Sequence, residues 1–486
     1  MKLGAIYPSV DGSDNADQAV TGFAIDHRKV APGTIFGAFQ GSAANGEDFI
    51  AAAISAGAIA VVARPEAQVE GALHIAGDQP RRLFAQLAAR FFTPVPGTII
   101  AVTGTNGKTS TAEMTRQLWR MAGERAASIG TLGVTTPDES ISTGLTTPDI
   151  VTFLSNMAGL AREGVTHVAY EASSHGLSQY RNEGLPVKAA AFTNFSRDHL
   201  DYHADMEEYF SAKLRLVHEV VDDGGTLVVH PDGSDWMARV AESGRARGLQ
   251  VLTVGEQGNF LRLVGRDATQ LGQELTLQHD GADRSVRLPL IGAYQAQNAL
   301  VAAALVLATG GQPSQVFDAM ARLQPVRGRL ERAVISPQGA PVYVDYAHTP
   351  DALEAAMQAL RPHVTGRLIT VMGAGGERDI GKRDPMGRAA AEFSDVVIVT
   401  DDNPRGEDPA DIRRAIMAGI AGQKAKAREI GDRREAIAAA ISEARRDDIV
   451  LIAGKGHEQG QIIGSAGSMR VLAFDDVTVS REEAAR

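Results

Sequence analysis

Cysteine is absent from the 486 residues of this chain, which excludes disulfide bonds, thiolate nucleophiles and zinc sites with cysteine ligands. Long apolar runs are absent too, because the best candidate, Ala51 to Ala63, is alanine-rich and shorter than the roughly 20 residues that cross a bilayer. The opening residues MKLGAIYPSVDGSD lack the basic flank and apolar stretch of a secretory signal. We therefore expect a cytoplasmic protein without membrane segments.

Basic residues are also fewer than acidic residues. The chain carries 48 lysine and arginine residues against 59 aspartate and glutamate residues, a formal net charge of -11. This balance argues against a general nucleic-acid binder, so we expect small-molecule or protein partners. With roughly 150 residues per domain, the length predicts about three domains.

Two interruptions in the helical patterns indicate where domains meet. Prolines and a glycine follow a helical pattern in 91–97, and the stretch 323–331 follows an alanine-rich helix. We predict domains at 1–96, 97–326 and 327–486.

Strand patterns alternate with helical patterns through the second and third domains, which predicts α/β folds with mostly parallel sheets and helices on both faces. The candidate strands, besides 98–102, are THVAYEA (166–172), AAAFTNF (189–195), GTLVVH (225–230), PVYVDYA (341–347), RLITVMGA (367–374), DVVIVTDD (395–402) and DDIVLIAGKG (447–456).

A glycine-rich loop, GTNGKTS (Gly104 to Ser110), joins the strand Thr98 to Val102 to a helical pattern. Backbone amides at such a strand-to-helix turn cradle phosphates, Lys108 reaches the β- and γ-phosphates, and Thr109 is a magnesium ligand. Val102 stands where the full phosphate-loop pattern has its first glycine. The loop predicts ATP binding, but it does not distinguish a kinase, a motor, a GTPase or a ligase.

Acidic and imidazole side chains follow two of the predicted strands. Glu171 ends one strand, where folds of this kind place a magnesium-binding carboxylate. The polar segment after the next strand contains Asp198, His199, Asp201, His203 and Lys213. Together these groups favour a hard cation held by oxygens and one imidazole over zinc.

Arg405 raises a question of its own, because it follows a buried strand and the turn-forming pair Asn403 and Pro404. The carboxyl ends of strands are where open α/β sheets bind ligands. We therefore expect Arg405 to project from the loop and to hold an anion, and a surface ion pair with Asp408 is the structural alternative.

Eight motifs occur in one order: TGTNGKTS, EASSHGL, TNFSRDHLDYH with the lysine after it, GRLE, DYAHTPDAL, GERDIGKR, DDNPR and GKGHE. In this set and order the chain resembles the Mur ligases, over nearly its whole length and most specifically from Thr103 onward. The resemblance implies an N-terminal α/β domain that holds a uridine nucleotide, a central P-loop domain that binds ATP, and a C-terminal Rossmann-like domain that brings an amino acid.

The resemblance also implies roles for the nucleotide and metal residues. The triphosphate would be bound by Gly104, Thr105, Asn106, Gly107, Lys108, Thr109 and Ser110, and the rest of ATP by Asn298, Arg329 and Asp345. Two magnesium ions would be held by Thr109, Glu171, His199 and Lys213, the lysine as a carbamate formed with CO2. A carbamate reverses the sign of the lysine, which suits a metal site. His348 is a candidate for the reacting centre, and an ordinary hydrogen-bonded histidine is the alternative.

For the other substrates the resemblance implies two further sets of residues. The UDP-muramoyl peptide would contact Thr146, Thr147, Ser173, Gln179 and Arg181. The amino acid would contact Arg383, Asp402, Asn403, Pro404, Arg405, Gly454 and Glu458. The DNPR pattern is the one associated with the diaminopimelate-adding branch of the family.

The implied reaction adds meso-2,6-diaminopimelate to the D-Glu side-chain carboxylate of UDP-N-acetylmuramoyl-L-Ala-D-Glu in peptidoglycan synthesis. It passes through an acyl phosphate, releases ADP and phosphate, and is carried out by a monomer. The family usually has Asp-Ser-Arg where this chain has Asp26, His27 and Arg28, and commonly an asparagine where it has Leu145. Both departures concern contacts with the UDP-sugar.

Three other functions remain open at this level. An L-lysine-adding ligase of the same family differs by one carboxylate in its substrate, and a folylpolyglutamate synthase shares the loop and the amide-forming chemistry. A P-loop regulator would use ATP to change shape without forming an amide. The GAGGER turn (373–378) resembles half a dinucleotide fingerprint but lacks the third glycine, which argues against a dehydrogenase.

Overall fold

The computed structural model describes residues 1–10, 12–41, 44–136, 138–141, 146–200, 202–269, 271–464 and 467–486. The chain divides into two compact units, which we call the first unit (Met1–Leu261 with Val301–Val316) and the second unit (Arg262–Leu300 with Phe317–Arg486). Within the described residues, every helix is too short or too polar to traverse a lipid bilayer. The partition into domains at residues 96 and 326 stays a prediction.

The first unit opens with a small parallel sheet in the order β1-β2-β3-β4. Its strands are β1 (Gly22–Ala24), β2 (Thr34–Gly37), β3 (Ala58–Ala63) and β4 (Leu73–Ala76). Helices α2 (Ile50–Ser55) and α3 (Pro80–Phe91) belong to the same part. The alanine-rich run 51–63 thus forms the body of a helix followed by a strand, which confirms the sequence interpretation.

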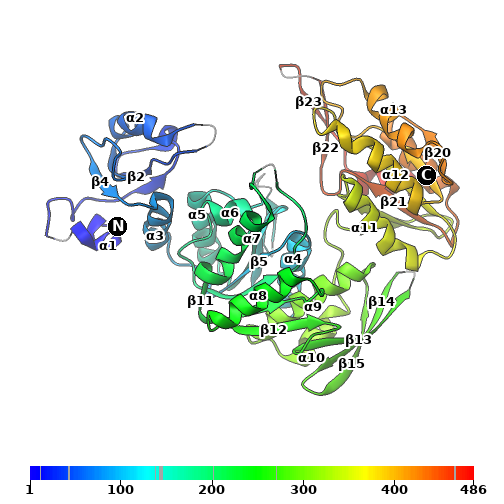
Figure 1. Ribbon diagram of the computed structural model, residues 1–486, viewed down its shortest axis with the longest axis horizontal. Helices are drawn as coiled ribbons and strands as arrows, with labels where there is room; N and C mark the ends of the chain where they lie inside the picture. Colours follow the sequence, from blue (N-terminus) through cyan, green and yellow to red (C-terminus); the bar gives the residue numbers. More distant parts are fainter. Residues whose placement is uncertain are drawn as a thin grey trace. The chain divides into compact units, whose positions relative to one another are not determined.

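The main sheet of the first unit has β5 in its middle (Figure 1), with parallel neighbours in the order β12-β11-β10-β5-β9-β6. Two short antiparallel strands, β7 (Gly133–Thr135) and β8 (Ser140–Ile141), extend it beyond β6. The parallel strands are β5 (Thr98–Thr103), β6 (Ala126–Gly130), β9 (His167–Glu171), β10 (Val187–Phe192), β11 (Val221–Val229) and β12 (Gln250–Gly255). The predicted strands in this region are confirmed.

Helices of the first unit connect these strands and bury one face each. They are α4 (Lys108–Met121), α5 (Ile150–Arg162), α6 (Ser174–Ser178), α7 (Met206–Arg215) and α8 (Asp235–Ala246). Asp149 caps α5 by accepting hydrogen bonds from the N–H groups of Val151 and Thr152, which satisfies donors that a helix start leaves open. Because β5 and β9 pair in parallel with Val102 opposite Glu171, the phosphate loop and Glu171 leave the sheet at the same edge.

The second unit contains an antiparallel group, β13 (Leu261–Thr269), β14 (Gly272–His279) and β15 (Ala282–Leu288), which the sequence analysis missed. Helices α9 (Ala293–Ala308) and α10 (Pro313–Met320) follow, and both run across the limits of the two units.

The second sheet of this unit has the order β16-β17-β21-β18-β19-β20. All neighbours are parallel except the edge pair β16 and β17. Its strands are β16 (Glu331–Ile335), β17 (Pro341–Asp345), β18 (Leu368–Met372), β19 (Val396–Val399), β20 (Lys426–Glu429) and β21 (Ile449–Ala453). Four of these six strands were predicted, and the two outer strands were not.

Helices cover both faces of this sheet (Figure 1), with a separate apolar core on each face. One face packs against α11 (Pro350–Leu360), α12 (Arg383–Phe393) and α13 (Pro409–Ile420), and the other against α14 (Arg433–Glu443) and α15 (Asp476–Ala484). A hairpin, β22 (Gly460–Ile463) and β23 (Arg470–Ala473), follows β21. The predicted mixed α/β fold is confirmed.

Helices α12 and α13 approach so closely that backbone meets backbone. A Cβ atom on Gly387 would lie 2.1 Å from the carbonyl oxygen of Ile416, and one on Gly419 would lie 2.1 Å from that of Asp384. Each helix therefore needs its own glycine to accept the other, and a side chain at either position would push the pair apart.

Candidate active site

The phosphate loop is held in shape by residues that follow β10. Thr193 Oγ1 donates to the carbonyl oxygen of Asn106 at 2.6 Å, and Asn194 Oδ1 accepts from the N–H of Asn106 at 2.9 Å. Gly104 has φ 137°, and a Cβ there would lie 2.0 Å from Thr193 Oγ1. The loop is thus built before any ligand arrives, and glycine is required at its first turn.

Two lysines converge on one carbonyl oxygen of this loop. Lys108 Nζ donates to Gly104 O at 3.0 Å and to Thr105 O at 2.7 Å, and Lys213 Nζ donates to Gly104 O at 2.7 Å. Lys213 is fully buried. Burial, with the charge of Lys108 acting the same way, lowers the pKa of Lys213 well below its ordinary value. Its environment therefore favours an uncharged amine.

Glu171 lies at the carboxyl end of β9, buried, beside the start of α4. Its carboxylate accepts from Thr109 Oγ1 at 3.0 Å and from the N–H of Thr131 at 2.7 Å. A Cβ on Gly130 would lie 2.1 Å from Glu171 Oε1, so the carboxylate fills the space that a side chain would take. A hydroxyl and a carboxylate this close offer hard oxygen ligands of the kind that magnesium prefers.

The imidazole and acid cluster predicted after β10 is organised around an aromatic ring. Tyr209 lies 5.9 Å from the ring of His199 and 5.3 Å from that of His203, and Lys213 Nζ lies 4.8 Å from the Tyr209 ring centre. Asp201 lies outside the described residues. Over the ranges that the structure describes, no three His, Asp or Glu side chains gather closely enough to hold a metal ion.

The residues predicted for the muramoyl peptide form one hydrogen-bonded group in the first unit. Thr147 Oγ1 donates to Glu171 O at 2.9 Å and accepts from Ser173 Oγ at 3.0 Å, and Arg181 Nη1 donates to Thr147 O at 2.8 Å. Gln179 Oε1 accepts from Arg181 Nη2 at 2.7 Å.

Thr146 connects the same group to the carboxylate of Glu171, whereas Thr147 contacts only its backbone carbonyl oxygen. Thr146 Oγ1 lies 3.0 Å from Thr131 Oγ1, and Thr131 Oγ1 donates to Glu171 Oε2 at 3.2 Å. Thr131 itself was missed, although it directly follows β6 at the same sheet edge. Leu145 lies outside the described residues.

Asp26, His27 and Arg28 follow β1 and make local contacts. Asp26 accepts from the N–H and the guanidinium of Arg28, and these bonds lower the pKa of Asp26 to about 2. His27 stacks on Phe49 with ring centres 4.4 Å apart. This departure from the family pattern thus places an imidazole on an aromatic ring.

The remaining nucleotide candidates lie in the second unit and are linked to one another. Asn298 Nδ2 donates to Gln295 Oε1 at 3.3 Å, and Gln295 Nε2 donates to Arg329 O at 2.9 Å. Asp345 accepts from the N–H of Leu330 at 2.7 Å, and burial raises its pKa.

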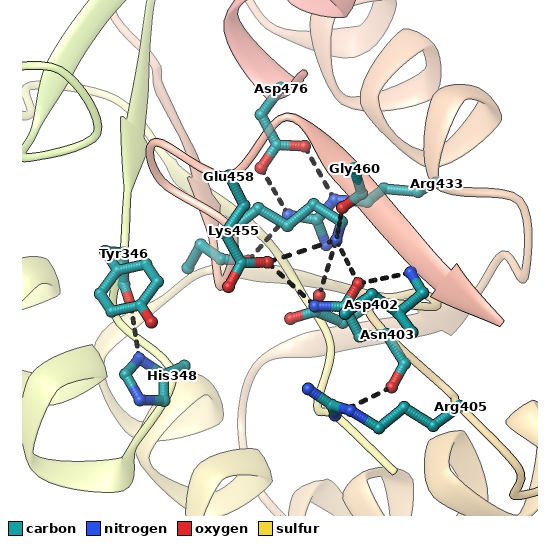
Figure 2. A network of polar contacts seen from close by, with 12 residues as sticks. Tyr346, His348, Asp402, Asn403, Arg405, Arg433, Lys455, Glu458, Gly460 and Asp476 are labelled. Carbon is teal, nitrogen blue, oxygen red and sulfur yellow. Dashed lines mark hydrogen bonds and ion pairs between the residues drawn. The ribbon is translucent and has the colours of Figure 1, made fainter. Parts of the chain in front are cut away.

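His348 is fixed in one orientation (Figure 2). Its Nδ1 lies 2.8 Å from Tyr346 O, an acceptor that requires a proton on Nδ1, and burial lowers the pKa of the imidazole. The hydrogen-bonded alternative is thus what the structure describes, and a role at the reacting centre stays a prediction.

The amino-acid candidates gather where β19 and β21 end. Asn403 Nδ2 donates to Glu458 Oε2 at 2.9 Å, and a Cβ on Gly454 would lie 2.7 Å from Asp402 Oδ2. Pro404 is buried beside them. Figure 2 shows Arg405 at the border of this network. The sequence motifs DDNPR and GKGHE are thus brought together in space.

Arg405 is held by carbonyl oxygens rather than by an acid. Its Nη1 donates to Gly376 O at 2.9 Å, and its backbone N–H donates to Ile462 O at 3.0 Å. Asp408 instead caps α13 by accepting from the N–H of Ala410. Among the described residues no carboxylate forms an ion pair with Arg405, so the structural alternative, a surface pair with Asp408, is not what the structure describes.

Arg383 is used differently from Arg405. Its buried guanidinium binds both carboxylate oxygens of Glu407, at 2.8 and 2.9 Å. A direct contact with substrate stays a prediction, and the contact seen is one that braces the loop after β19.

Two buried cations beside this site were missed. Lys455, inside GKGHE, contacts Asp402, Asn403 and Gly460, while Arg433 forms an ion pair with Asp476 at 2.7 Å. A lysine between two glycines is a signal of close packing, but the sequence gives no sign of its partners.

Comparisons with known proteins agree with this arrangement. Family models for the Mur ligase middle domain and for the Mur ligase glutamate ligase domain match residues 102–306 and 328–456. UDP-N-acetylmuramoyl-L-alanyl-D-glutamate--2,6-diaminopimelate ligase of Zymomonas mobilis is 58% identical, covering 96% of this chain and 95% of the relative. The protein of the same name from Bradyrhizobium diazoefficiens is 50% identical, over 97% of this chain and 95% of its own.

A solved structure of a protein with that same name superposes with a TM-score of 0.77 at 33% identity, covering 100% of this chain and 99% of the other. Both the sequence relatives and this structure thus span the phosphate-loop site and the amino-acid site together. On this evidence the chain belongs to the Mur ligase family.

Proposed function

We propose that this protein is an ATP-dependent ligase that joins meso-2,6-diaminopimelate to the D-Glu side-chain carboxylate of UDP-N-acetylmuramoyl-L-Ala-D-Glu during peptidoglycan synthesis. Relatives at 58% and 50% identity carry the name of that reaction. The observation that carries the choice of amino acid is Arg405, whose guanidinium lies at the border of the cluster that contains Asp402, Asn403 and Glu458 and forms no ion pair with a described carboxylate (Figure 2).

The chemistry proceeds in two steps. The D-Glu carboxylate attacks the γ-phosphate of ATP, which gives an acyl phosphate and ADP, because a carboxylate is a poor electrophile. The amine of the amino acid then adds to the acyl carbon, and phosphate leaves from the tetrahedral intermediate. The backbone amides of Gly104 to Ser110 and the ammonium of Lys108 hold the phosphates, so the chain contributes mainly positioning and charge neutralisation.

Magnesium fits the residues at the edge of the main sheet. Thr109 Oγ1 and the Glu171 carboxylate, 3.0 Å apart, are hard oxygen donors, and His199 and a carbamate on Lys213 would complete the set. The lowered pKa of Lys213 supports the carbamate, because only the uncharged amine attacks CO2. When bound, the metal neutralises charge that develops on the phosphates.

The candidate amino-acid site has groups of both charges, which suits the distal end of diaminopimelate, where an ammonium group and a carboxylate lie together. Arg405 would bind the distal carboxylate through two parallel charge-assisted hydrogen bonds, and Asp402 with Glu458 would receive the ammonium group. L-lysine lacks that carboxylate, and it would leave the guanidinium unpaired.

The muramoyl peptide would lie against Thr147, Ser173 and Arg181; Ser173 and Arg181 bond to Thr147, which in turn donates to the backbone carbonyl oxygen of Glu171. This brings its carboxylate toward the metal-binding oxygens. We further propose that the protein acts in the cytoplasm as a monomer on small molecules.

A single competition experiment tests this function. The protein is incubated with UDP-N-acetylmuramoyl-L-Ala-D-Glu, ATP and equal amounts of meso-diaminopimelate and L-lysine, and the nucleotide products are identified by mass spectrometry. We expect the diaminopimelate tripeptide to dominate, with one ADP and one phosphate per amide. A dominant lysine tripeptide would reassign the amino acid, and ATP hydrolysis without amide formation would reject the ligase.

A further inference from the structure

The buried ammonium of Lys455 lies at the centre of the candidate amino-acid site (Figure 2). What we infer from it rests on the proposed function. Its side chain is 0% exposed. Nζ donates to Asn403 Oδ1 at 2.8 Å and to Gly460 O at 2.8 Å, and forms an ion pair with Asp402 Oδ1 at 3.1 Å. Two of the three N–H donors of the ammonium are thus engaged in hydrogen bonds, and Asp402 Oδ1 balances its charge.

Lys455 determines which way the amide of Asn403 points. Asn403 Oδ1 accepts from Lys455 and also from the N–H of Ile462 at 2.9 Å. Since both partners are donors only, the amide oxygen must face them, and Nδ2 is left to donate to Glu458 Oε2 at 2.9 Å. Through Asn403, the lysine therefore holds Glu458 in place.

Lys455 also sets the charge that an incoming amino acid meets. Its Nζ lies 3.1 Å from an oxygen of Asp402 and 3.7 Å from one of Glu458, and buried charges are screened little by salt. A substrate ammonium drawn to these two carboxylates is repelled by Lys455. A substrate whose distal end carries a carboxylate besides the ammonium group is also attracted to Arg405, which offsets this repulsion.

The neighbouring cation is bound differently. Arg433 forms a fully buried ion pair with Asp476 at 2.7 Å, and its charge also acts on Asp402 and Glu458. Of these two buried cations, Lys455 is the one that forms an ion pair with each of the two carboxylates.

We propose that Lys455 is a positioning and specificity-determining residue of the amino-acid site. It orients Asn403 and Glu458, and its charge weakens binding of a side chain that ends in an ammonium group alone, relative to one that ends in an ammonium and a carboxylate. Discrimination between diaminopimelate and L-lysine thus depends on a repulsive group as well as on Arg405.

The test replaces Lys455 by methionine, which keeps the length and removes the charge, with Lys426→Met on the exposed strand β20 as the matched control. Values of kcat/KM are measured for meso-diaminopimelate and for L-lysine, or an inhibition constant where L-lysine is not turned over. We expect Lys455→Met to raise the KM for diaminopimelate and to lower the preference for it over L-lysine by about tenfold. The KM for ATP should stay within about twofold of wild type, and the control should match wild type throughout.

A structural role would give a different result. Partial unfolding lowers kcat for both amino acids alike, so an unchanged preference would overturn the proposal. Because Lys455→Met leaves the buried Asp402 and the partly exposed Glu458 short of a partner, the double variant Lys455→Met, Glu458→Gln removes one charge of each sign. The double variant should melt nearer to wild type and regain part of the preference, and a folded double variant with the preference of Lys455→Met would also overturn the proposal.

The wild-type protein separates this inference from the function on which it rests. If wild type forms no amide with either amino acid, the proposed function fails. If wild type forms the diaminopimelate amide and the variants keep its preference, the inference on Lys455 alone fails.

Discussion

At the scale of single residues, the amino-acid site uses two arginines for different purposes. Arg383 is buried and bound to Glu407 by both carboxylate oxygens, so it stabilises the loop. Among the residues that the structure describes, the guanidinium of Arg405 donates to carbonyl oxygens and pairs with no carboxylate. A guanidinium in this state gains the most from an incoming carboxylate.

Replacement of Arg405 by lysine should raise the KM for diaminopimelate about 10- to 100-fold, because one of two charge-assisted bonds is lost at roughly 1.5 to 3 kcal/mol. The backbone bond from residue 405 to Ile462 does not depend on the side chain, so the fold should be kept. Steady-state kinetics with each substrate varied in turn provides the measurement.

The matched control is Arg414→Lys on the exposed side of α13, where Arg414 pairs with Asp411. Its kinetic constants should equal those of wild type. An unchanged KM for diaminopimelate in Arg405→Lys would remove the selector role, whatever happens to ATP.

Sequence reasoning found residues that belong to a recognisable motif, and it missed residues whose importance depends on a contact with a residue distant in the chain. Arg405 and Glu171 were placed correctly at strand ends because parallel strands bring their carboxyl ends to one edge. Lys455 and Thr131 were missed because their importance lies in contacts with residues distant in the chain. The Arg383 to Glu407 bond spans 24 residues, and no local pattern announces it.

At the scale of elements, the phosphate loop depends on the fit between β5, α4 and the segment after β10. Gly104 combines a left-handed φ of 137° with a space in which a Cβ would lie 2.0 Å from Thr193 Oγ1. Both conditions require glycine, and an alanine would push the loop away from Thr193 and Asn194, which hold Asn106.

Gly104→Ala should lower kcat/KM for ATP by about 100-fold, since displacement by about 1 Å has effects of that size. Gly123→Ala is the control, because Gly123 also has a positive φ, of 97°, but has open space around it. The control should lose about 1 to 2 kcal/mol of stability without losing activity. Equal kinetic losses in both variants would show that φ strain alone is responsible.

Elements with a continuous buried run were predicted well. The strands at 98–103, 368–372 and 449–453 are buried along their whole length, and their sequences are mostly apolar. Of the missed strands, β20 is exposed throughout and β15 is exposed except at Val286 and Leu288. Their charged residues resemble those of a loop, and only pairing with a neighbouring strand defines them.

At the scale of the whole molecule, the candidate residues for phosphate and metal and those for the amino acid lie in different compact units. The phosphate loop, Glu171 and Lys213 belong to the first unit, and Arg405 with Lys455 belongs to the second. The second unit also buries several titratable groups, which makes its stability depend on pH.

His457 gives this dependence a definite sign. Burial, together with the charges of Arg329 and Arg327, lowers the pKa of His457 to about 4, and its Nδ1 has no hydrogen-bond partner among the described residues. Because an unfolded histidine titrates near 6.5, the unfolded state binds more protons between those values. Stability is therefore lost as the pH falls from about 6.5 toward 4.

His457→Gln should lose less stability than wild type between pH 7 and pH 5. Hydrogen exchange of the β21 amides, followed by mass spectrometry, measures local stability in this region. The raised pKa values of Glu331 and Asp345 act in the opposite direction, so the difference between variant and wild type is the relevant quantity. If the stability of the variant and that of wild type change in parallel with pH, His457 is not responsible for the pH dependence.

The glycine contacts between α12 and α13 affect how tightly an amino acid binds. The close contact opposes rolling or sliding of one helix along the other, and the Arg383 to Glu407 bond fastens the loop that precedes α13 to the start of α12. The loop that carries Arg405 is therefore held by contacts within the protein. Binding of the amino acid then costs little conformational entropy in this loop, so most of the interaction free energy contributes to affinity.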